Sequence, residues 1–384
     1  MSSGHVSPSS TAENEKGLIL LKNTFGTNLI LTLFGESHGS EIGAVLDGLT
    51  PGLPVDEAFI ASQLALRCPF GAISTARHEP DEFRIVSGVY RGRTTGTPLC
   101  ILLPNTDTRS VDYADFARVP RPSHADYTAG VRYAGFNDDR GGGHSSGRLT
   151  APLVAAGAIV LAALREKGIL IGTHISRLAG IDDASLTPTA DEIRVLGSRP
   201  FAVLSASAGD AMRAAIEAAG ADGDSVGGVL ETAVLGLPAG IGEPWFDSVE
   251  GLLAHAIFSI PGVKGVSFGD GFDIADRRGS EANDSFARIG DSVVTKTNHS
   301  GGVQGGITNG MPLTFRTAVK PTPSIGKTQK TLDLTTGEET ELSVKGRHDP
   351  AVVHRARVVV DSVTALVLAD LLTGRFGTDY LRED

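Results

Sequence analysis

Cysteine is scarce in this chain: Cys68 and Cys100 are the two examples among 384 residues. Two cysteines cannot build a disulfide framework or a cysteine-rich zinc site, and they are typical of a protein from a reducing cytosol. The sequence also lacks an H-x-x-x-H pair and any cluster of Cys and His that would indicate a metal ligand set. We therefore expect a cytoplasmic protein without a bound metal.

Net positive charge is lacking as well, since the formal charge is −11. Such a surface disfavours nucleic acid and anionic membranes as partners, although a site for a small anion needs only local positive charge. The most apolar stretch, residues 149–164, contains Pro152, and we expect it to be too short to span a bilayer. Residues 1–16 have no apolar segment typical of a signal peptide, so we expect a disordered tail before one domain at 17–384.

Glycine, in contrast, is abundant, with 48 residues, while 41% of the chain is hydrophobic and 5% aromatic. These values are typical of a soluble globular protein with many tight turns. Apolar periodicity predicts a mixed α/β fold, with strands at 28–34, 42–46, 82–90, 98–103 and 312–319 and helices at 55–66, 152–165, 210–219, 249–257 and 351–372. Residues 104–148 show little periodicity and are rich in Arg, His and Gly, which favours a functional segment over a disordered one.

Residues 35–39 read Gly-Glu-Ser-His-Gly and follow a predicted strand, which is the G-x-S-x-G pattern of α/β-hydrolases. Few strands precede it, the following residues are a poor start for the required helix, and His38 adjoins Ser37 too closely to serve easily as its base. We therefore favour a ligand-facing Ser37 and His38 pair. A serine hydrolase and a purely structural turn are the alternatives.

Two further segments combine histidine with arginine. His124 lies among Arg118, Arg121 and Arg132, and a histidine beside bound anions is pushed toward its protonated form. Residues 140–148 read Arg-Gly-Gly-Gly-His-Ser-Ser-Gly-Arg, so that backbone N–H groups and hydroxyls could approach an anion closely before the next helix begins. A flexible glycine hinge is the alternative for the second segment.

The last two motifs lie near the carboxyl end. Residues 326–328 resemble the end of a Walker A motif, but Pro321 stands where its first glycine is required, so the P-loop interpretation fails. Asp349 and Pro350 precede the final predicted helix, where an ordinary helix start is an equally good explanation. From the residues alone we predict a site for a small polyanion, with several arginines and two or more histidines.

In this order, the segments resemble the chorismate synthase family, and the resemblance covers the chain beyond its first 16 residues. The further matching segments are 24–26, 42–43, 47–48, 87–89, 94–98, 105–110, 298–306 and 320–324. The resemblance implies a lyase of the shikimate pathway that converts 5-enolpyruvylshikimate 3-phosphate (EPSP) to chorismate by 1,4-elimination of phosphate, with reduced FMN and no net redox change. It also implies a single-domain sheet–helix–sheet sandwich with an internal pseudo-twofold, assembled as a homotetramer.

The resemblance further implies roles for individual residues. Substrate would be bound by Arg67, Arg121, Ser146, Arg148 and Arg347, since arginine forks suit its carboxylates and phosphate. His38 would act as general acid on the departing phosphate with Ser37, His124 would support the reduced flavin, and Asp349 would help remove the flavin N5 proton. The expected flavin contacts are His144, Ser145, Ser146, Gly305, Lys320, Pro321, Thr322, Pro323, Ser324 and Arg347.

The chain departs from the family at a few positions. Many members carry arginine where His144 stands, and others have one where Ala72 falls. The length leaves no room for a separate reductase domain, so we expect reduced FMN from an external flavin reductant, with an intrinsic NADPH-dependent reductase activity as the alternative. A flavin- or phosphate-binding protein without catalytic activity remains the other functional alternative, beside the hydrolase.

Overall fold

The computed structural model describes residues 23–74, 81–106, 115–344 and 349–382. The predicted amino-terminal tail and Arg347 lie outside the described residues.

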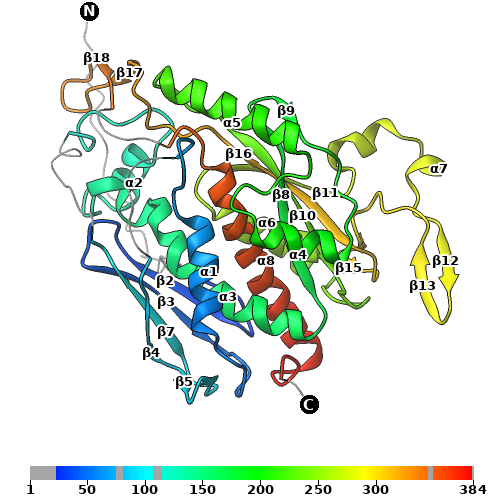
Figure 1. The fold of residues 1–384 in the computed structure, drawn as a ribbon. Helices are drawn as coiled ribbons and strands as arrows, with labels where there is room; N and C mark the ends of the chain where they lie inside the picture. The colour runs from blue at the N-terminus through cyan, green and yellow to red at the C-terminus, as the bar shows by residue number, and fades with distance from the viewer. Residues whose placement is uncertain (1–22, 75–80, 107–114, 345–348, 383–384) are drawn as a thin grey trace, which may run out of the picture.

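Two antiparallel sheets of five strands enclose a layer of helices (Figure 1). The first sheet has the order β1 (Thr24–Phe25), β2 (Ile30–Gly35), β3 (Glu41–Asp47), β7 (Leu99–Pro104) and β4 (Arg84–Ser87). The second has the order β11 (Val263–Phe268), β16 (Leu313–Val319), β10 (Gly228–Leu235), β8 (Leu170–Leu178) and β9 (Ile181–Asp182). This arrangement confirms the predicted sheet–helix–sheet sandwich, whereas the internal pseudo-twofold stays a prediction.

The helical layer consists of α1 (Glu57–Arg67), α3 (Thr150–Glu166) and α8 (Val353–Phe376). Helix α3 packs on β3 and β7, α8 packs on β8 and β10, and the two helices pack on each other. They approach closely at Gly157, where a Cβ would lie 2.5 Å from the Cβ of Ser362. Buried side chains from both sheets and from these helices form one contiguous hydrophobic cluster, which places the irregular loops at the margin of a rigid core.

Helix α3 is apolar on all sides because it is covered on all sides. Together with the 3-10 turn before it, the helix runs from Gly147 to Glu166 and is long and apolar enough to cross a membrane. The expectation that this stretch is too short is therefore wrong. Its burial inside the protein, 89% of the most apolar window, is what identifies it as a core helix.

Most predicted elements are confirmed, and the differences have local causes. The strand predicted at 82–90 is interrupted at Gly88, which has φ of 83°, and continues as β5 (Val89–Tyr90), paired with β6 (Arg93–Thr94). The irregular segment at 104–148 contains α2 (Asp126–Arg132), none of whose apolar side chains is buried, so no apolar periodicity indicated it. Helix α4 (Ala190–Ser198) was also not predicted.

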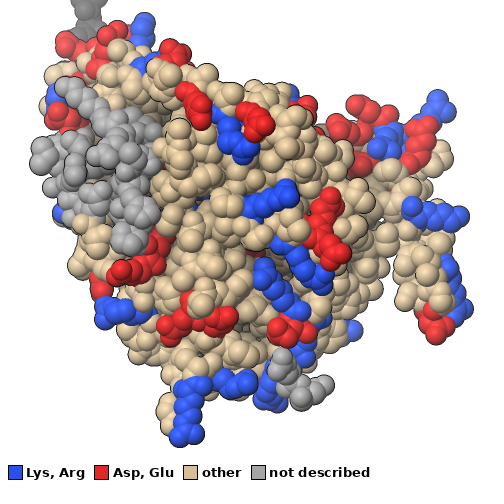
Figure 2. All heavy atoms as spheres, in the orientation of Figure 1, with Lys and Arg blue, Asp and Glu red and all other residues tan. Residues whose placement is uncertain are grey.

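The remaining elements lie around this core. They are α5 (Ala206–Ala221), α6 (Val249–Phe258), α7 (Gly279–Ala282), and the hairpins β12 (Phe286–Ile289) with β13 (Ser292–Thr295), β14 (Val303–Gln304) with β15 (Ile307–Thr308), and β17 (Gln329–Leu332) with β18 (Glu339–Leu342). Hairpin β12–β13 projects from the body at the right of Figure 1. On the face shown in Figure 2, acidic and basic side chains are interspersed on a largely neutral surface.

Candidate active site

The glycine loop, residues 140–148, lies against both histidines that the sequence singled out. Gly141, Gly142 and Gly143 have φ of 59°, 88° and 53°. A Cβ on Gly141 would lie 2.1 Å from Cε1 of His38, and a Cβ on Gly142 would lie 3.2 Å from Cε1 of His124. Because neither position has room for an ordinary side chain, the glycines bring together two rings that are distant in the sequence.

Ser37 and His38 are buried in the turn that follows β2. Ser37 Oγ lies 3.1 Å from His38 Nδ1, and it also donates to the carbonyls of Arg140 (3.2 Å) and Gly141 (3.3 Å). The backbone N–H of Ser37 donates to Gly143 O at 3.2 Å. A hydroxyl whose proton points to a carbonyl accepts from Nδ1–H, so His38 is not arranged as the base that would activate Ser37.

The segment after this turn also differs from a hydrolase. Strand β3 follows and pairs with β2 as a hairpin, whereas a nucleophile elbow requires a turn from strand to helix. The geometry therefore favours the ligand-facing pair over the nucleophile.

His124 belongs to a buried network centred on Asp126. His124 Nδ1 lies 2.6 Å from Asp126 Oδ1, and Arg121 donates through Nε and Nη2 to the two carboxylate oxygens at 2.8 and 2.7 Å. Arg121 Nη1 also donates to Ser324 Oγ at 3.0 Å. Burial alone would raise the pKa of Asp126, but the hydrogen bonds from Arg121 and His124 outweigh it and hold that pKa well below its usual range.

A second buried carboxylate, Asp81, joins two of the predicted substrate arginines. Arg67 donates to Asp81 Oδ2 through Nε at 3.0 Å and through Nη2, and Arg148 Nη1 pairs with Oδ1. The carboxylate side chain is 2% exposed. Burial again opposes ionisation, but the charges of Arg67 and Arg148 lower the pKa of Asp81. The two guanidinium groups therefore converge on one anion.

Asn105 connects this arginine pair to the histidine turn. Its side-chain oxygen accepts from Arg148 Nε at 3.1 Å, and its Nδ2 donates to the carbonyls of Glu36 and Gly39, each at 2.9 Å. Arg148 also donates to Pro104 O at 3.1 Å. The arginine pair and the Ser37 turn are thus parts of one hydrogen-bonded unit.

Asp349 is linked to the arginine pair through Arg355. Arg355, at the start of α8, pairs with Asp349 through Nη1 and donates through Nε to Arg67 O at 2.7 Å. Burial lowers the pKa of Arg355, and the nearby Asp349 opposes that shift. The alternative that Asp349 and Pro350 begin this helix is wrong, because α8 begins at Val353 with Val352 as its N-cap. Asp349 instead takes part in a charged link, through Arg355, to the Arg67 backbone.

The residues predicted to hold the flavin lie beside these networks. His144 Nδ1 donates to Gly35 O at 2.8 Å, which leaves Nε2 for another partner, and Lys320 Nζ donates to Ser123 O at 2.5 Å. Burial, and then the charge of Lys264, lower the pKa of Lys320. Ser145 is exposed, while Ser146 Oγ accepts from the Arg148 backbone at 3.3 Å.

Residues 321–324 form the turn after β16, and Ser225 Oγ donates to Thr322 O at 2.7 Å. Gly305 is the exception among the predicted contacts. It lies exposed in the turn between β14 and β15, whose neighbouring Gly306 packs against Glu243 and Ser248. Its flavin contact stays a prediction.

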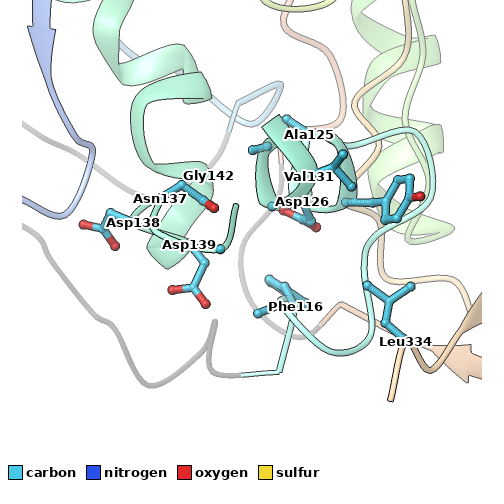
Figure 3. Close-up of a pocket in the computed structure, with 14 residues that line it drawn as sticks. Phe116, Ala125, Asp126, Val131, Asn137, Asp138, Asp139, Gly142 and Leu334 are labelled. Atoms are coloured by element: carbon cyan, nitrogen blue, oxygen red, sulfur yellow. The ribbon is translucent and has the colours of Figure 1, made fainter. Parts of the chain in front are cut away.

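A pocket of about 250 Å³ adjoins the Asp126 network (Figure 3). Phe116, Val131 and Leu334 line one side, and Asp138 and Asp139 lie on the other. Asp126 and Gly142 are also among its lining residues. In the described part of the chain, no group of three or more His, Cys, Asp or Glu side chains is arranged to hold a metal ion.

Sequence reasoning missed four residues of the site: Asp81, Asn105, Asp126 and Arg355. Asp126 follows His124 by two positions, so the spacing R-x-x-H-x-D offered a signal for it. The partners of Asp81 are 14 and 67 positions away, and no local pattern predicts contacts at such separations.

Known proteins with similar sequences and a similar fold belong to one family. The sequence pattern of the chorismate synthase family matches residues 29–373. The chorismate synthase of Pyrococcus abyssi is 47% identical over 350 residues, which cover 91% of this chain and 97% of that protein. The Aeropyrum pernix chorismate synthase is 44% identical over 352 residues, covering 91% and 93%. A crystal structure of chorismate synthase aligns with a TM-score of 0.73 at 28% identity, covering 93% of this chain and 95% of that one.

The close approach of Gly141 to His38 predicts that Gly141→Ala is destabilising. The new methyl group would collide with the ring 2.1 Å away, at a backbone φ of 59° that alanine rarely adopts. We expect the free energy of unfolding to fall by about 2 to 4 kcal/mol in urea titrations. Gly147→Ala is the matched control, because nothing lies within 4 Å of its Cβ position and its φ is negative. Equal stabilities of the two variants would contradict the packing described here.

The buried Asp81 predicts a pH-dependent loss in Asp81→Asn. The pKa of Asp81 is lowered on folding, so its stabilisation is complete above the unfolded-state pKa of roughly 4 and is lost as the pH falls through the folded-state value. We expect a loss of about 3 kcal/mol at pH 7 by urea unfolding, shrinking in acid. Asp191→Asn, at an exposed pair with Arg194, should stay within about 0.5 kcal/mol of the parent at both pH values. A pH-independent difference for Asp81→Asn would show that the ion pair is not its cause.

Proposed function

Because this chain belongs to the chorismate synthase family, we propose that the residues around its glycine loop form the active site, within one catalytic domain of residues 17–384. The reaction is the 1,4-elimination of phosphate from EPSP to give chorismate, so the enzyme is a carbon–oxygen lyase of the shikimate pathway. The observation that carries the site assignment is the contact of Gly141 with His38 and of Gly142 with His124.

The arginines supply the positive charge that the substrate requires. EPSP carries two carboxylates and a phosphate, whereas the chain as a whole is acidic. Arg67, Arg121 and Arg148 are each held by a buried carboxylate in a fixed orientation, and the planar guanidinium fork with its five N–H groups suits bidentate binding of carboxylate and phosphate. Ser146, two positions from Arg148, adds a hydroxyl, and Arg347 would complete the set.

His38 would act as general acid on the departing phosphate. Its Nδ1 is engaged by Ser37, so Nε2 is the nitrogen that would donate the proton. Phosphate leaves more readily when a positioned acid neutralises its charge, which contributes typically about 10²- to 10⁴-fold to such reactions. Ser37 would fix the ring and is not a nucleophile in this scheme.

The residues beside the loop fit reduced FMN. Gly142 has no Cβ where one would contact His124, so its main chain is accessible at that point. A cation and three hydroxyls suited to the phosphate and the ring oxygens of FMN come from Lys320, Ser145, Thr322 and Ser324. His144 would contribute Nε2, and Pro321 and Pro323 make the turn rigid. Reduced FMN, when bound, would supply an electron-rich centre and a nitrogen, N5, that is able to accept the substrate's C6 proton.

Two residues would stabilise charge and accept a proton at the flavin. His124 would support the reduced form through Nε2, because Nδ1 faces Asp126. Asp349 would accept the proton from N5, with its carboxylate oriented by Arg355. We further propose a cytoplasmic homotetramer that receives reduced FMN from an external reductant, on the strength of the family resemblance.

Anaerobic turnover of EPSP with chemically reduced FMN tests the function. We expect chorismate and phosphate to appear in equal amounts, and no product with oxidised FMN. Flavin binding without product would instead indicate a binding protein. Labelling of Ser37 by a fluorophosphonate, with no flavin requirement, would indicate a hydrolase.

Within that assay, His38→Asn tests the general acid. We expect kcat to fall by about 100-fold or more, since a proton donor is removed at the leaving phosphate. His255→Asn is the control, because His255 is exposed on α6 and packs edge-on against Phe25, away from the loop. Similar rates for the two variants would remove His38 from the mechanism.

A further inference from the structure

The carboxylate of Asp126 contacts both Arg121 and His124. This carboxylate, 5% exposed, accepts four hydrogen bonds. Oδ1 accepts from His124 Nδ1 (2.6 Å) and Arg121 Nη2 (2.7 Å), and Oδ2 accepts from Arg121 Nε (2.8 Å) and the Arg121 backbone N–H (3.0 Å). The same side chain thus holds a predicted substrate residue and a predicted flavin residue.

This contact determines which nitrogen of His124 carries a proton. An ionised carboxylate is only an acceptor, so a bare Nδ1 lone pair 2.6 Å from Oδ1 would be repelled. Nδ1 must therefore be protonated, and Nε2 is the nitrogen left to exchange a proton with a ligand. Arg121 Nη2 lies only 3.0 Å from the same Nδ1, and two donors at that distance are compatible because both bond to Oδ1.

The ring is also confined on its other side. A Cβ at Gly142 would lie 3.2 Å from Cε1 and 3.6 Å from Nε2 of His124, so the Nε2 edge faces the glycine loop. Arg121 is anchored at the same time to Ser324. The orientation of the imidazole is thus determined by Asp126 on one edge and by the loop backbone on the other.

We propose that Asp126 is a positioning residue for the reaction, which holds His124 as the Nδ1–H form with Nε2 directed to the glycine loop and holds the Arg121 fork with the same carboxylate. The proposal rests on the proposed function of His124. A carboxylate acts in the same way in Ser-His-Asp triads, where its replacement by the amide keeps the geometry but inverts the tautomer, with a large loss of kcat.

The variant Asp126→Asn tests this role. With its carboxamide oxygen at the Oδ2 position, the side chain still accepts from Arg121 N and Nε. The amide nitrogen then stands at the Oδ1 position, where the bond from Arg121 Nη2 is lost and an N–H group faces His124 Nδ1, which moves the proton to Nε2. We expect ¹⁵N NMR of the ligand-free protein to show Nδ1–H of His124 in the parent and Nε2–H in the variant, with the resonance identified by its absence in His124→Gln. In the EPSP assay we expect kcat to fall by about 100-fold.

A chemically matched cluster elsewhere in the chain provides the control. Asp270 Oδ2 accepts from His299 Nδ1 at 2.7 Å and from Arg277 Nη2 at 2.8 Å, and the His299 side chain is 19% exposed, as is that of His124. Asp270→Asn can place its carboxamide oxygen at the Oδ2 position, to which both donors point, so we expect Nδ1–H of His299 to persist and kcat to stay unchanged. An equal loss of kcat in both variants would overturn the proposal, because the effect would then not be specific to His124.

The remaining outcomes also decide the question. If Asp126→Asn keeps Nδ1–H on His124 and parental kcat, Asp126 has no positioning role. If that variant does not fold, Asp126→Glu replaces it. We expect the Nδ1–H form to persist because the negative charge stays, and kcat to fall because the imidazole ring is displaced. An unchanged kcat would overturn the proposal. The NMR result does not depend on turnover, so a parent protein that does not convert EPSP refutes the proposed function without deciding the tautomer.

Discussion

The absence of a Cβ at three successive positions is the constraint on which the site depends. Gly141 and Gly142 let the main chain touch the rings of His38 and His124, and a Cβ at Gly143 would collide with the carbonyl of Asp138, 2.0 Å away. All three have positive φ, a conformation that costs glycine little and other residues considerably more. The loop therefore acts as a template: it determines the separation of the two histidines, and its carbonyls at 140, 141 and 143 hold Ser37 in place.

Buried carboxylates keep several arginines of the site together before an anion binds. Like charges repel, and isolated buried charges are costly. Asp81 between Arg67 and Arg148, and Asp126 beside Arg121, offset both costs and orient the guanidinium groups. The same pairing explains how a chain with a net charge of −11 can present local positive charge to a polyanion. The carboxylates therefore neutralise part of this charge and also determine the direction in which each guanidinium group points.

The sequence predicted the parts of the fold that strong patterns encode. Helices α3 and α8 and strands β2, β3 and β16 carry clear apolar runs, and the glycine loop was recognised as a functional segment. Helix α2 was missed because none of its apolar side chains is buried, so it has no apolar stripe to detect. The positioning partners were missed for another reason: Asp81, Asn105 and Arg355 reach the site through contacts between distant segments, which depend on the packing of the whole core. The sequence indicated that the glycines bind an anion, but their contact with both histidines is visible only in the structure.

If the glycine loop is a template, the loop and the histidine turn are assembled before any ligand binds, and amide hydrogen exchange of the ligand-free protein measures this directly. The backbone N–H of Ser37 bonds to Gly143 O, that of Ser146 also to Gly143 O, and that of Leu149 to Ser146 O. We expect these amides to exchange slowly without flavin or substrate, at rates that change little when both are added. Fast exchange that slows only on ligand binding would contradict the account, because the ligand and not the glycine template would then build the site.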